Sequence, residues 1–340
     1  MNILVTGGAG FIGANFIRHM LSTYEYTIVN LDLLTYAGNL SNLHEVSKNK
    51  NYHFVQGDIG DQALVGEIFR AYDIQTVINF AAESHVDRSI EGPAIFFKTN
   101  VLGTETLLEE AKRYWKVNPL DKSCMQYKKG TRFIQISTDE VYGTLGKEGY
   151  FTEKTNLAPN SPYSASKASA DMIVRAYHAT YGLPAMVTRC SNNYGPYQHP
   201  EKLIPLIIGQ AMGENTIPIY GDGKQVRDWL HVEDHCKAID TVLHKGELGE
   251  VYNVGGNNEK ENLEVVKLIL HKLNKSESLI KYVEDRLGHD RRYAIDNTKI
   301  TKELNWSPSY TFEEGMEKTI DWYLENIDWM ESAMDGNKVM

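Results

Sequence analysis

The sequence is poor in cysteine and has no excess of basic charge, and each scarcity excludes a class of protein. Among 340 residues, the only cysteines are Cys124, Cys190 and Cys236, without metal-ligand spacing. We therefore expect a reducing compartment, no disulfide framework and no metal site. Acidic residues outnumber basic ones by 45 to 35, which gives a formal net charge of -10. This balance argues against a nucleic-acid-binding protein.

Long apolar runs, repeats and low-complexity tracts are also missing. No apolar run approaches the roughly 18 residues that a membrane-spanning helix needs. The amino terminus opens on the short run Ile3-Leu4-Val5 rather than on a basic segment with a long apolar stretch behind it. We expect a cytoplasmic protein without membrane contact, and its 42% apolar and 24% charged residues describe an ordinary globular chain.

What the sequence does contain is an alternation of short apolar runs with segments of helical spacing. The runs are apolar on both faces, which is typical of strands buried between helical layers. The predicted strands are Asn2–Val5, Thr27–Leu31, His53–Val55, Thr76–Phe80, Phe133–Ile136 and Ala185–Thr188. The predicted helices are Gly13–Leu21, Gln62–Tyr72, Gly103–Tyr114 and Ser164–Tyr181. This order predicts an α/β fold with a Rossmann-like, doubly wound parallel sheet.

After about Cys190 the pattern changes to shorter elements. Prolines punctuate this part of the chain at Pro196, Pro200, Pro205 and Pro218. We predict a first domain over residues 1–190 and a smaller mixed α/β carboxy-terminal lobe over residues 191–340. Some segments of the lobe are expected to interleave with the first domain.

The first predicted strand runs into TGGAGFIG, where Gly7, Gly10 and Gly13 are spaced GxxGxxG and Phe11-Ile12 opens a helix. Glycines allow the sharp turn and the close approach of a pyrophosphate to the positive end of that helix. A structural turn alone would explain three glycines about as well. The dinucleotide interpretation therefore depends on the residues that end the second and third predicted strands.

Acidic residues end these next two strands. Asp32 lies 19 residues past Gly13, where a carboxylate can bind the ribose hydroxyls of adenosine and repel a 2′-phosphate. This position favours NAD over NADP. Asp58-Ile59, in QGDI, would suit an adenine edge, and a simple loop aspartate explains that pair equally well.

A second motif is YSASK, in which Tyr163 and Lys167 lie four apart and so share one helix face. Tyrosine normally loses its proton at about pH 10. A neighbouring ammonium, together with a positive nicotinamide ring, would lower that pKa and make a base. Thr138, at a strand end, could hold a substrate hydroxyl beside the tyrosine. An isolated YxxxK is more often a partly exposed pair, so the combination carries the inference.

The stretch ISTDEVYG places Asp139 and Glu140 side by side directly after an apolar strand. Adjacent carboxylates repel each other and resist burial, and an arbitrary pair of this kind is usually a solvated turn. Two carboxyls that cannot both comfortably ionise are, however, suited to act as one acid and one base.

Taken together, these motifs resemble the extended short-chain dehydrogenase/reductases and, within them, the dTDP-glucose 4,6-dehydratases. The resemblance covers nearly the whole chain, through TGGAGFIG, DLLTYAGNL, FAAESHVDRSI, ISTDEVYG, YSASKA, RCSNNYGPYQ, EKLIPL, YGDGKQVRDWLHVEDH and GHDRRYAID. Thr138-Asp139-Glu140 is decisive, because related epimerases and decarboxylases lack the acid pair there. Leu287 departs from the family, which usually has proline between Arg286 and Gly288. The change would loosen a loop near the phosphates without removing a chemical group.

The resemblance implies conversion of dTDP-glucose to dTDP-4-keto-6-deoxyglucose and water, with NAD recycled as a catalyst. Tyr163 would take the proton of the 4-hydroxyl while the C4 hydride passes to NAD. Glu140 would then remove the C5 hydrogen, and protonated Asp139 would donate to the departing C6 hydroxyl. Return of the hydride to C6 would complete the cycle.

The resemblance also implies the membership of each site. Residues 1–190 would bind NAD and carry the catalytic residues, and residues 191–340 would mainly bind the sugar nucleotide. The implied catalytic residues are Thr138, Asp139, Glu140, Tyr163 and Lys167. The implied cofactor-binding residues are Gly7, Gly10, Phe11, Ile12, Gly13, Asp32, Tyr36, Asp58, Ile59, Thr99, Tyr163 and Lys167. The implied substrate-binding residues are Glu83, Ser84, Thr138, Asn192, Lys202, Leu203, Ile219, Tyr220, Arg227, Asn262, Arg286 and His289.

Two other kinds of enzyme and one kind of regulator would share some of these motifs. A nucleotide-sugar 4-epimerase would share the glycines, Tyr163 and Lys167 but would not need the acid pair. A 4,6-dehydratase acting on another nucleotide is harder to distinguish, and a dinucleotide-sensing regulator would have no reason to retain all the motifs.

The predicted helices Gly103–Tyr114 and Ser164–Tyr181 should pack side by side. In the family this pair meets its two-fold mate as a four-helix bundle, which implies a homodimer.

Overall fold

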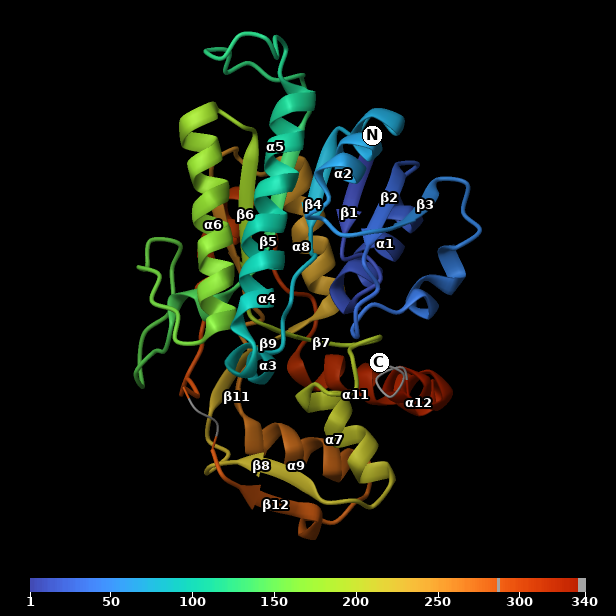
Figure 1. Cartoon of the computed structure of the whole chain (residues 1–340). Helices are drawn as coiled ribbons and strands as arrows, with labels where there is room; N and C mark the ends of the chain where they lie inside the picture. Colours follow the sequence, from blue (N-terminus) through green and yellow to red (C-terminus); the bar gives the residue numbers. More distant parts are fainter. Residues whose placement is uncertain (286–287, 336–340) are drawn as a thin grey trace.

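A seven-stranded parallel sheet forms the centre of the protein, seen in a computed structural model that describes residues 1–285 and 288–335 (Figure 1). The strand order is β10-β6-β5-β4-β1-β2-β3. The strands are β1 (Asn2–Thr6), β2 (Thr27–Asp32), β3 (Tyr52–Gln56), β4 (Thr76–Asn79), β5 (Arg132–Thr138), β6 (Ala185–Cys190) and β10 (Val251–Val254). The order runs outward in both directions from β1 and β4, which confirms the predicted doubly wound Rossmann-like sheet and leaves a crevice at that switch point.

Helices cover both faces of this sheet. One apolar cluster joins Val5 of β1 to Ile17, Ile239 and Ile300 on α1, α8 and α10. On the other face, helices α2, α5 and α6 pack against the strands through a second cluster. The bounds are α1 (Phe11–Thr23), α2 (Gln62–Ala71), α5 (Thr104–Trp115), α6 (Pro162–Tyr181), α8 (Val232–Lys245) and α10 (Thr298–Leu304). Burial of both faces explains why the strands show continuous apolar runs rather than alternation.

The smaller lobe lies below the carboxyl ends of the large sheet in Figure 1 and has an apolar core of its own. Two small sheets, β11-β9-β7 and β12-β8, belong to this part of the molecule. The strands are β7 (Asn192–Tyr194), β8 (Ile217–Tyr220), β9 (Val226–His231), β11 (Glu259–Glu261) and β12 (Ile280–Val283). The helices are α7 (Leu203–Met212), α9 (Asn262–Lys272), α11 (Phe312–Glu325) and α12 (Ile327–Asp335).

Segments from the second half of the chain also build the large sheet. Strand β10 pairs in parallel with β6, and α8 and α10 cover the same face as α1. The two halves therefore interleave, and a division of the chain at residue 190 stays a prediction. Within the two described ranges, no helix is long and apolar enough to cross a membrane.

The helix predicted at Gly103–Tyr114 is the last part of a longer, irregular helix. A short helix, α4 (Pro93–Phe97), leads into a wide π-helical segment, Lys98–Gly103, and then into α5. Asn100 lies in this segment, and its side chain accepts from the backbone N–H of Glu83 at 2.8 Å and donates to Ser166 Oγ of α6 at 2.8 Å. The wide turn thus aims a buried amide at two neighbouring segments, an outcome that periodicity alone does not predict.

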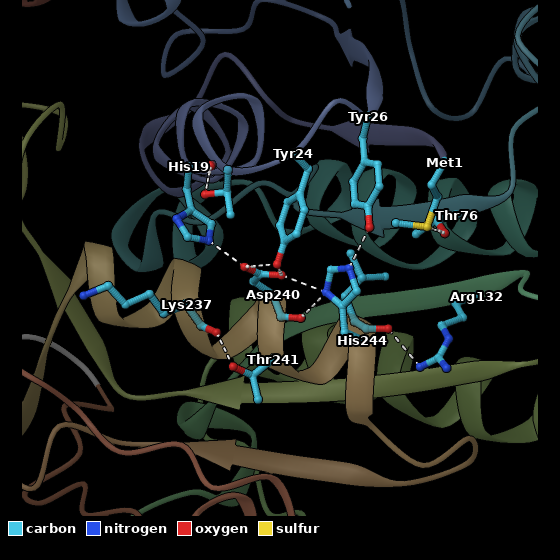
Figure 2. A network of polar contacts seen from close by, with 12 residues as sticks. Met1, His19, Tyr24, Tyr26, Thr76, Arg132, Lys237, Asp240, Thr241 and His244 are labelled. Carbon is cyan, nitrogen blue, oxygen red and sulfur yellow. Dashed lines mark hydrogen bonds and ion pairs between the residues drawn. The ribbon is translucent and has the colours of Figure 1, made fainter.

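A polar network ties α8 to α1 at one side of the sheet. Figure 2 shows His19, Tyr24 and His244 directed toward Asp240 of α8. His19 Nε2 lies 2.7 Å from Asp240 Oδ2, Tyr24 donates its hydroxyl at 3.1 Å, and His244 Nδ1 lies 2.8 Å from Oδ1. Although burial opposes it, the hydrogen bonds of His19 and His244 hold the pKa of Asp240 well below its ordinary value. Asp240 is therefore held as an anion between the two helices.

Candidate active site

A cavity of about 350 Å³ opens at the carboxyl ends of the central strands, beside the switch point. Every residue that the sequence implies for cofactor binding lines this cavity. Five of the implied substrate-binding residues line it as well: Glu83, Ser84, Thr138, Asn192 and Lys202. Chain segments separated by up to about two hundred residues are thus brought into one site, at the place where doubly wound sheets bind ligands.

The glycine loop between β1 and α1 packs closely against neighbouring backbone, and only glycine fits there. Gly7 has φ +67°, and a Cβ there would lie 2.7 Å from Ala81 Cα. A Cβ at Gly13 would lie 2.4 Å from the carbonyl oxygen of Gly7. Helix α1 begins directly after Gly10, which provides no side-chain cap. The first backbone N–H groups of α1 are therefore available to an anionic group such as a pyrophosphate.

Asp32 ends β2 at the wall of the cavity and is 8% exposed. Its two carboxylate oxygens accept from the backbone N–H groups of Ala9 and Leu34, each at 2.8 Å. Burial raises the pKa of Asp32, and these two N–H groups oppose that rise. Each oxygen keeps a further lone pair that a ribose hydroxyl could use. The residue therefore fits the ribose contact that the sequence predicts.

The cavity lining also includes Asp58, Ile59 and Thr99, together with Tyr36. Asp58 Oδ1 accepts from the backbone N–H of Gly60 at 2.8 Å, which fixes the turn after β3. The Arg88 guanidinium lies 3.6 Å from the centre of the Tyr36 ring. Tyr36 is therefore held in place by a cation–π contact.

The acid pair lies where β5 ends, in a short 3₁₀ turn that covers Asp139–Tyr142. Thr138 caps this turn, and its hydroxyl accepts from the backbone N–H of Glu140 at 3.3 Å. Asp139 is 1% exposed behind the cavity wall, and Glu140 lines the cavity itself. The two neighbours in sequence are thus placed in different environments.

Burial raises the pKa of Asp139 well above its ordinary value, and the charges of Glu140 and Asp228 add to the rise. Arg227 and the hydrogen bond with Thr138 act in the opposite direction without reversing it. These surroundings favour the protonated form of the carboxyl, which is the form that a general acid needs.

Tyr163 and Lys167 lie in the first turns of α6. Ser161 forms a capping box with Ser164, and Pro162 occupies the start of the helix, so the position of Tyr163 is fixed locally. Tyr163 is 9% exposed and Lys167 is 4% exposed, and both line the cavity. The Lys167 ammonium donates to the carbonyl oxygen of Ile136 at 2.7 Å.

The predicted lowering of the Tyr163 pKa is not produced by the protein's own groups. Burial raises this pKa well above its ordinary value, and the charges of Glu140, Cys190 and Asp139 raise it further. A hydrogen bond with Thr138 is the opposing influence. The sequence-based expectation combines Lys167 with a bound nicotinamide ring and does not include the opposing charges of the acid pair. A lowered Tyr163 pKa in the presence of that ring stays a prediction.

The other implied substrate residues that the structure describes lie in the smaller lobe and do not line the cavity. Arg227 is buried, donates to the carbonyl oxygen of Asp290 at 2.9 Å and lies over the Tyr293 ring at 4.3 Å. Ile219 is 2% exposed in the core of the lobe, so only its backbone could contact a ligand, whereas Tyr220 is exposed.

Three further implied residues mark the ends of elements or loops of this lobe. Leu203 begins α7 and Asn262 begins α9. His289 Nδ1 lies 2.6 Å from Asp285 Oδ1. Arg286 and the atypical Leu287 lie outside the described residues. The assignment of these residues to a diphosphate and base site stays a prediction.

Buried oxygens without hydrogen-bond partners occur on three implied site residues: Asp139 Oδ2, Asn192 Oδ1 and Asn262 Oδ1. Buried polar atoms are paired in nearly all proteins, so such groups indicate places where a ligand completes the bonding. Of the three residues, Asn192 lines the cavity, and its unpaired oxygen, the glycine loop and Asp32 together fit a dinucleotide and a polar co-substrate there. The described residues contain no His, Cys, Asp and Glu cluster able to hold a metal ion.

Sequence reasoning missed several residues of the site. Cys190, Ser191, Asn193 and Gln198 line the cavity, and Asp228 acts on the acid pair. The stretch RCSNNYGPYQ is one of the family motifs, but the resemblance implies only Asn192 from it. Its position directly after β6, at the same sheet edge as Thr138, is the signal that indicates the other residues.

Comparison with known proteins places this geometry in a family. Residues 4–319 match the family model described as GDP-mannose 4,6 dehydratase. A dTDP-glucose 4,6-dehydratase of Xanthomonas campestris is 57% identical over 98% of this chain and 96% of its own length. A Bacillus anthracis dTDP-glucose 4,6-dehydratase, solved in complex with NAD, is 54% identical, with TM-score 0.88 over 98% of this chain and 99% of that one.

A second solved structure agrees with the first. The Streptomyces venezuelae dTDP-glucose 4,6-dehydratase, solved with NAD and TYD bound, is 46% identical with TM-score 0.91, and the match covers 98% of this chain and all of that one. Full-length identity at this level, together with a dinucleotide cavity that contains Tyr163, Lys167 and an adjacent acid pair, shows that this chain belongs to the dTDP-glucose 4,6-dehydratase family.

Proposed function

We propose that the protein is an NAD-dependent dehydratase that converts dTDP-glucose to dTDP-4-keto-6-deoxyglucose and water. The observation that carries this proposal is the burial of Asp139, whose pKa is raised, directly behind Glu140 in the cavity that Tyr163 also lines. An epimerase needs the tyrosine and the cofactor but gains nothing from a buried acid whose pKa is raised. A regulator that only senses the dinucleotide would need neither.

Tyr163 and Thr138 act in the first step. When bound, NAD supplies the acceptor for the hydride of C4 and later returns that hydride to C6. Tyr163, as phenolate, removes the proton of the 4-hydroxyl, and Thr138 holds that hydroxyl in place. Lys167 supplies positive charge on the same helix face. The product of this step is a ketone at C4, which makes the C5 hydrogen acidic.

Elimination of water then uses the two carboxyls separately. Glu140 lines the cavity and, as a carboxylate, takes the C5 proton. Asp139 holds its proton because burial and the neighbouring charge of Glu140 raise its pKa, and it donates that proton to the departing C6 hydroxyl. After elimination Asp139 is an anion and Glu140 is neutral, so the pair exchanges roles without a net change in charge.

Cations and amides of the smaller lobe would hold the nucleotide. We assign the diphosphate to Arg227, Arg286 and Asn192, because the planar guanidinium can donate two bonds to a phosphate. Arg227 is already ordered by Tyr293 and by the carbonyl oxygen of Asp290, which reduces the conformational entropy lost on binding. The remaining proposed contacts to the base and ribose are made by Asn262, Lys202, Leu203, Ile219, Tyr220 and His289.

The experiment that tests this function compares nucleotide sugars. The purified protein with NAD is incubated with dTDP-glucose, UDP-glucose or GDP-mannose, and the products are assayed for a base-sensitive 4-keto sugar by absorbance and mass. We expect loss of one water from dTDP-glucose and far slower turnover of the other two. A galactose product without loss of water would instead establish an epimerase. Faster turnover of UDP-glucose or GDP-mannose than of dTDP-glucose would mean that the substrate carries another nucleotide.

We also propose that the protein is a homodimer and that it acts in the cytoplasm. Helices α5 and α6 pack side by side, and the adjoining surface exposes Ile95, Phe97, Leu102 and Met172. Exposed apolar side chains grouped on neighbouring helices favour association with a second copy. Light scattering at micromolar concentration should give twice the 38.5 kDa chain mass. Leu102→Lys with Met172→Lys should shift this value toward the monomer, and a wild-type monomer would refute the dimer.

A further inference from the structure

The carbonyl oxygen of Ala9, in the glycine loop, accepts a hydrogen bond from a buried side chain outside the cofactor cavity. Asn42 belongs to the 3₁₀ segment Leu40–Val46, is 2% exposed and does not line the cavity. Its Nδ2 donates to the Ala9 carbonyl oxygen at 2.9 Å, and the backbone N–H of Asn39 donates to the same oxygen at 3.0 Å. Asn42 therefore holds the glycine loop from behind.

The backbone N–H of Ala9 is held by the residue that fits the ribose contact. This N–H donates to Asp32 Oδ2 at 2.8 Å, and Ala9 is fully buried. Gly7 and Gly10, on either side of Ala9 in the loop, line the cavity. Both polar groups of one backbone residue are thus fixed, one by the carboxylate at the cavity wall and the other by Asn42. A displacement of Asn42 would therefore affect the loop and Asp32 together.

The orientation of Asn42 is set by α12, the last helix that the structure describes. Trp329 of α12 donates its indole Nε1–H to Asn42 Oδ1 at 2.9 Å, across 287 residues of sequence. Because this oxygen accepts, the amide nitrogen of Asn42 is directed to Ala9, and a flipped amide would lose both bonds. The Trp329 ring packs against Trp322 and Tyr197, with ring centres 5.1 and 5.7 Å away. A chain of hydrogen bonds thus runs from α12 through Asn42 into the glycine loop.

The carboxy-terminal helices also contact a second segment of the cavity lining. Gln198 lines the cavity, and its carbonyl oxygen accepts from the Tyr323 hydroxyl of α11 at 2.6 Å. The preceding residue, Tyr197, has φ +68°, a conformation that costs free energy for a residue other than glycine. Arg18 of α1 donates to the Tyr197 hydroxyl at 2.9 Å, and the ring centres of Trp322 and Tyr197 lie 4.6 Å apart. Helices α11 and α12 therefore support the cavity through two separate segments.

We propose that α12 is part of the cofactor site: Trp329 orients Asn42, and Asn42 is a positioning residue that preorganises the glycine loop and Asp32 for NAD. The proposal deepens the proposed function and rests on it, because it concerns the cofactor of that reaction. The role requires no contact of either side chain with the cofactor. An enzyme that recycles NAD within each turnover gains from slow release, and a loop ordered before binding reduces the conformational entropy lost on binding.

Interruption of this chain of contacts should weaken NAD binding. In Asn42→Ala the Ala9 carbonyl oxygen loses its side-chain donor, so the loop must be ordered when NAD binds. We expect the Kd for NAD to rise about two- to tenfold, the range for ordering one side chain on binding. Trp329→Phe keeps an aromatic ring and removes only the N–H donor, so a rise in the same direction and no larger is expected. Calorimetric titration of the apoprotein with NAD measures both changes.

A second readout does not depend on the cofactor. Hydrogen exchange of the apoprotein, followed by mass spectrometry, reports the protection of residues 6–12, where the Ala9 N–H donates to Asp32. Both variants should exchange faster in this segment and at the wild-type rate in residues 185–190 of β6. If the wild type binds no NAD, the proposed function fails, and exchange of the loop still tests the role of Asn42. An unchanged Kd for NAD, or unchanged exchange of the loop, in Asn42→Ala would overturn that role.

Matched variants separate this chain of contacts from general stability. Trp322→Phe makes the same chemical change in the neighbouring ring of α11 and should leave the Kd and the loop exchange at their wild-type values. Asp240→Asn changes the α1–α8 network and should also leave both unchanged. Equal effects of Trp322→Phe and Trp329→Phe, or no effect of Trp329→Phe, would overturn the contribution of α12. Should Asn42→Ala fail to fold, Trp329→Phe, at a partly exposed residue, decides the proposal alone.

Discussion

Asp139 and Asp240 are both largely enclosed by protein, yet their pKa values move in opposite directions. Asp240 is surrounded by donors, His19, His244 and Tyr24, and its pKa falls (Figure 2). Asp139 is buried, and the charges of Glu140 and Asp228 add to the effect of burial, so its pKa rises. The first arrangement stabilises an anion that joins two helices. The second favours a protonated carboxyl, which can act as a general acid. The comparison shows that enclosure alone does not decide the role of a carboxyl group.

The largest expected effects come from the active-site side of this comparison. Asp139→Asn should still reduce the bound cofactor with dTDP-glucose and exchange the C5 hydrogen with deuterated water, because Tyr163 and Glu140 are intact. Elimination of water should slow by about 100- to 10,000-fold, the usual contribution of one general acid. Rapid mixing with mass spectrometry measures each step, and normal elimination in this variant would remove Asp139 from the mechanism.

The companion variants should stop the cycle at other points. Glu140→Gln should reduce cofactor but exchange little C5 hydrogen, since the base is missing. Tyr163→Phe should show neither event. Normal C5 exchange in Glu140→Gln would mean that another group is the base. The assignment of one carboxyl of ISTDEVYG as acid and the other as base would then be wrong.

A smaller effect is expected for a carboxylate that serves binding only. Asp32→Ala should weaken NAD affinity by the worth of one or two charge-assisted hydrogen bonds, about 1.5 to 3 kcal/mol each. Calorimetric titration of the apoprotein measures this loss. Asp32→Asn is the matched control, because it keeps the shape and one acceptor and should lose less. Unchanged NAD affinity in Asp32→Ala would show that Asp32 does not bind the ribose.

Asp240→Asn should affect stability and leave the chemistry unchanged. The substitution removes the anion that accepts from His19, Tyr24 and His244, and charged hydrogen bonds of this kind contribute about 1.5 to 3 kcal/mol. The free energy of unfolding from urea titrations should fall by about that amount, with turnover on dTDP-glucose at the wild-type rate. A lower turnover rate in a fully folded variant would contradict the purely structural role.

The smallest expected effect is the pH dependence of this network. The hydrogen bond with Asp240 raises the pKa of His244, so its contribution is complete below the unfolded value of about 6.5 and is lost as pH rises through the folded value. The lowered pKa of Asp240 gives a contribution present above about 3.9 and lost as pH falls. The stability difference between wild type and Asp240→Asn should therefore be larger near pH 6 than near pH 9, as urea unfolding at both values would show. Equal differences at the two values would mean that His244 is not charged by this contact.

Features that depend on neighbours in the chain could be predicted from the sequence. They are the GxxGxxG loop, the acid at the end of β2, Tyr163 and Lys167 on one helix face, and the alternation of strands and helices. Each is a local relation, set by helical spacing or by the backbone freedom of glycine. The fold class follows from such relations, whereas the family and some cavity residues, such as Tyr36 and Thr99, follow from the resemblance of the motifs.

The charge and the orientation of those residues depend on the folded structure. Asp139 owes part of its raised pKa to Asp228 of β9, and Asp171 of α6 is paired with Arg189 of β6. The local sequence pattern also does not predict the wide turn at Asn100 or the contribution of β10 to the large sheet. A pKa depends on burial and on charges brought from distant segments, and those distances do not exist until the chain has folded.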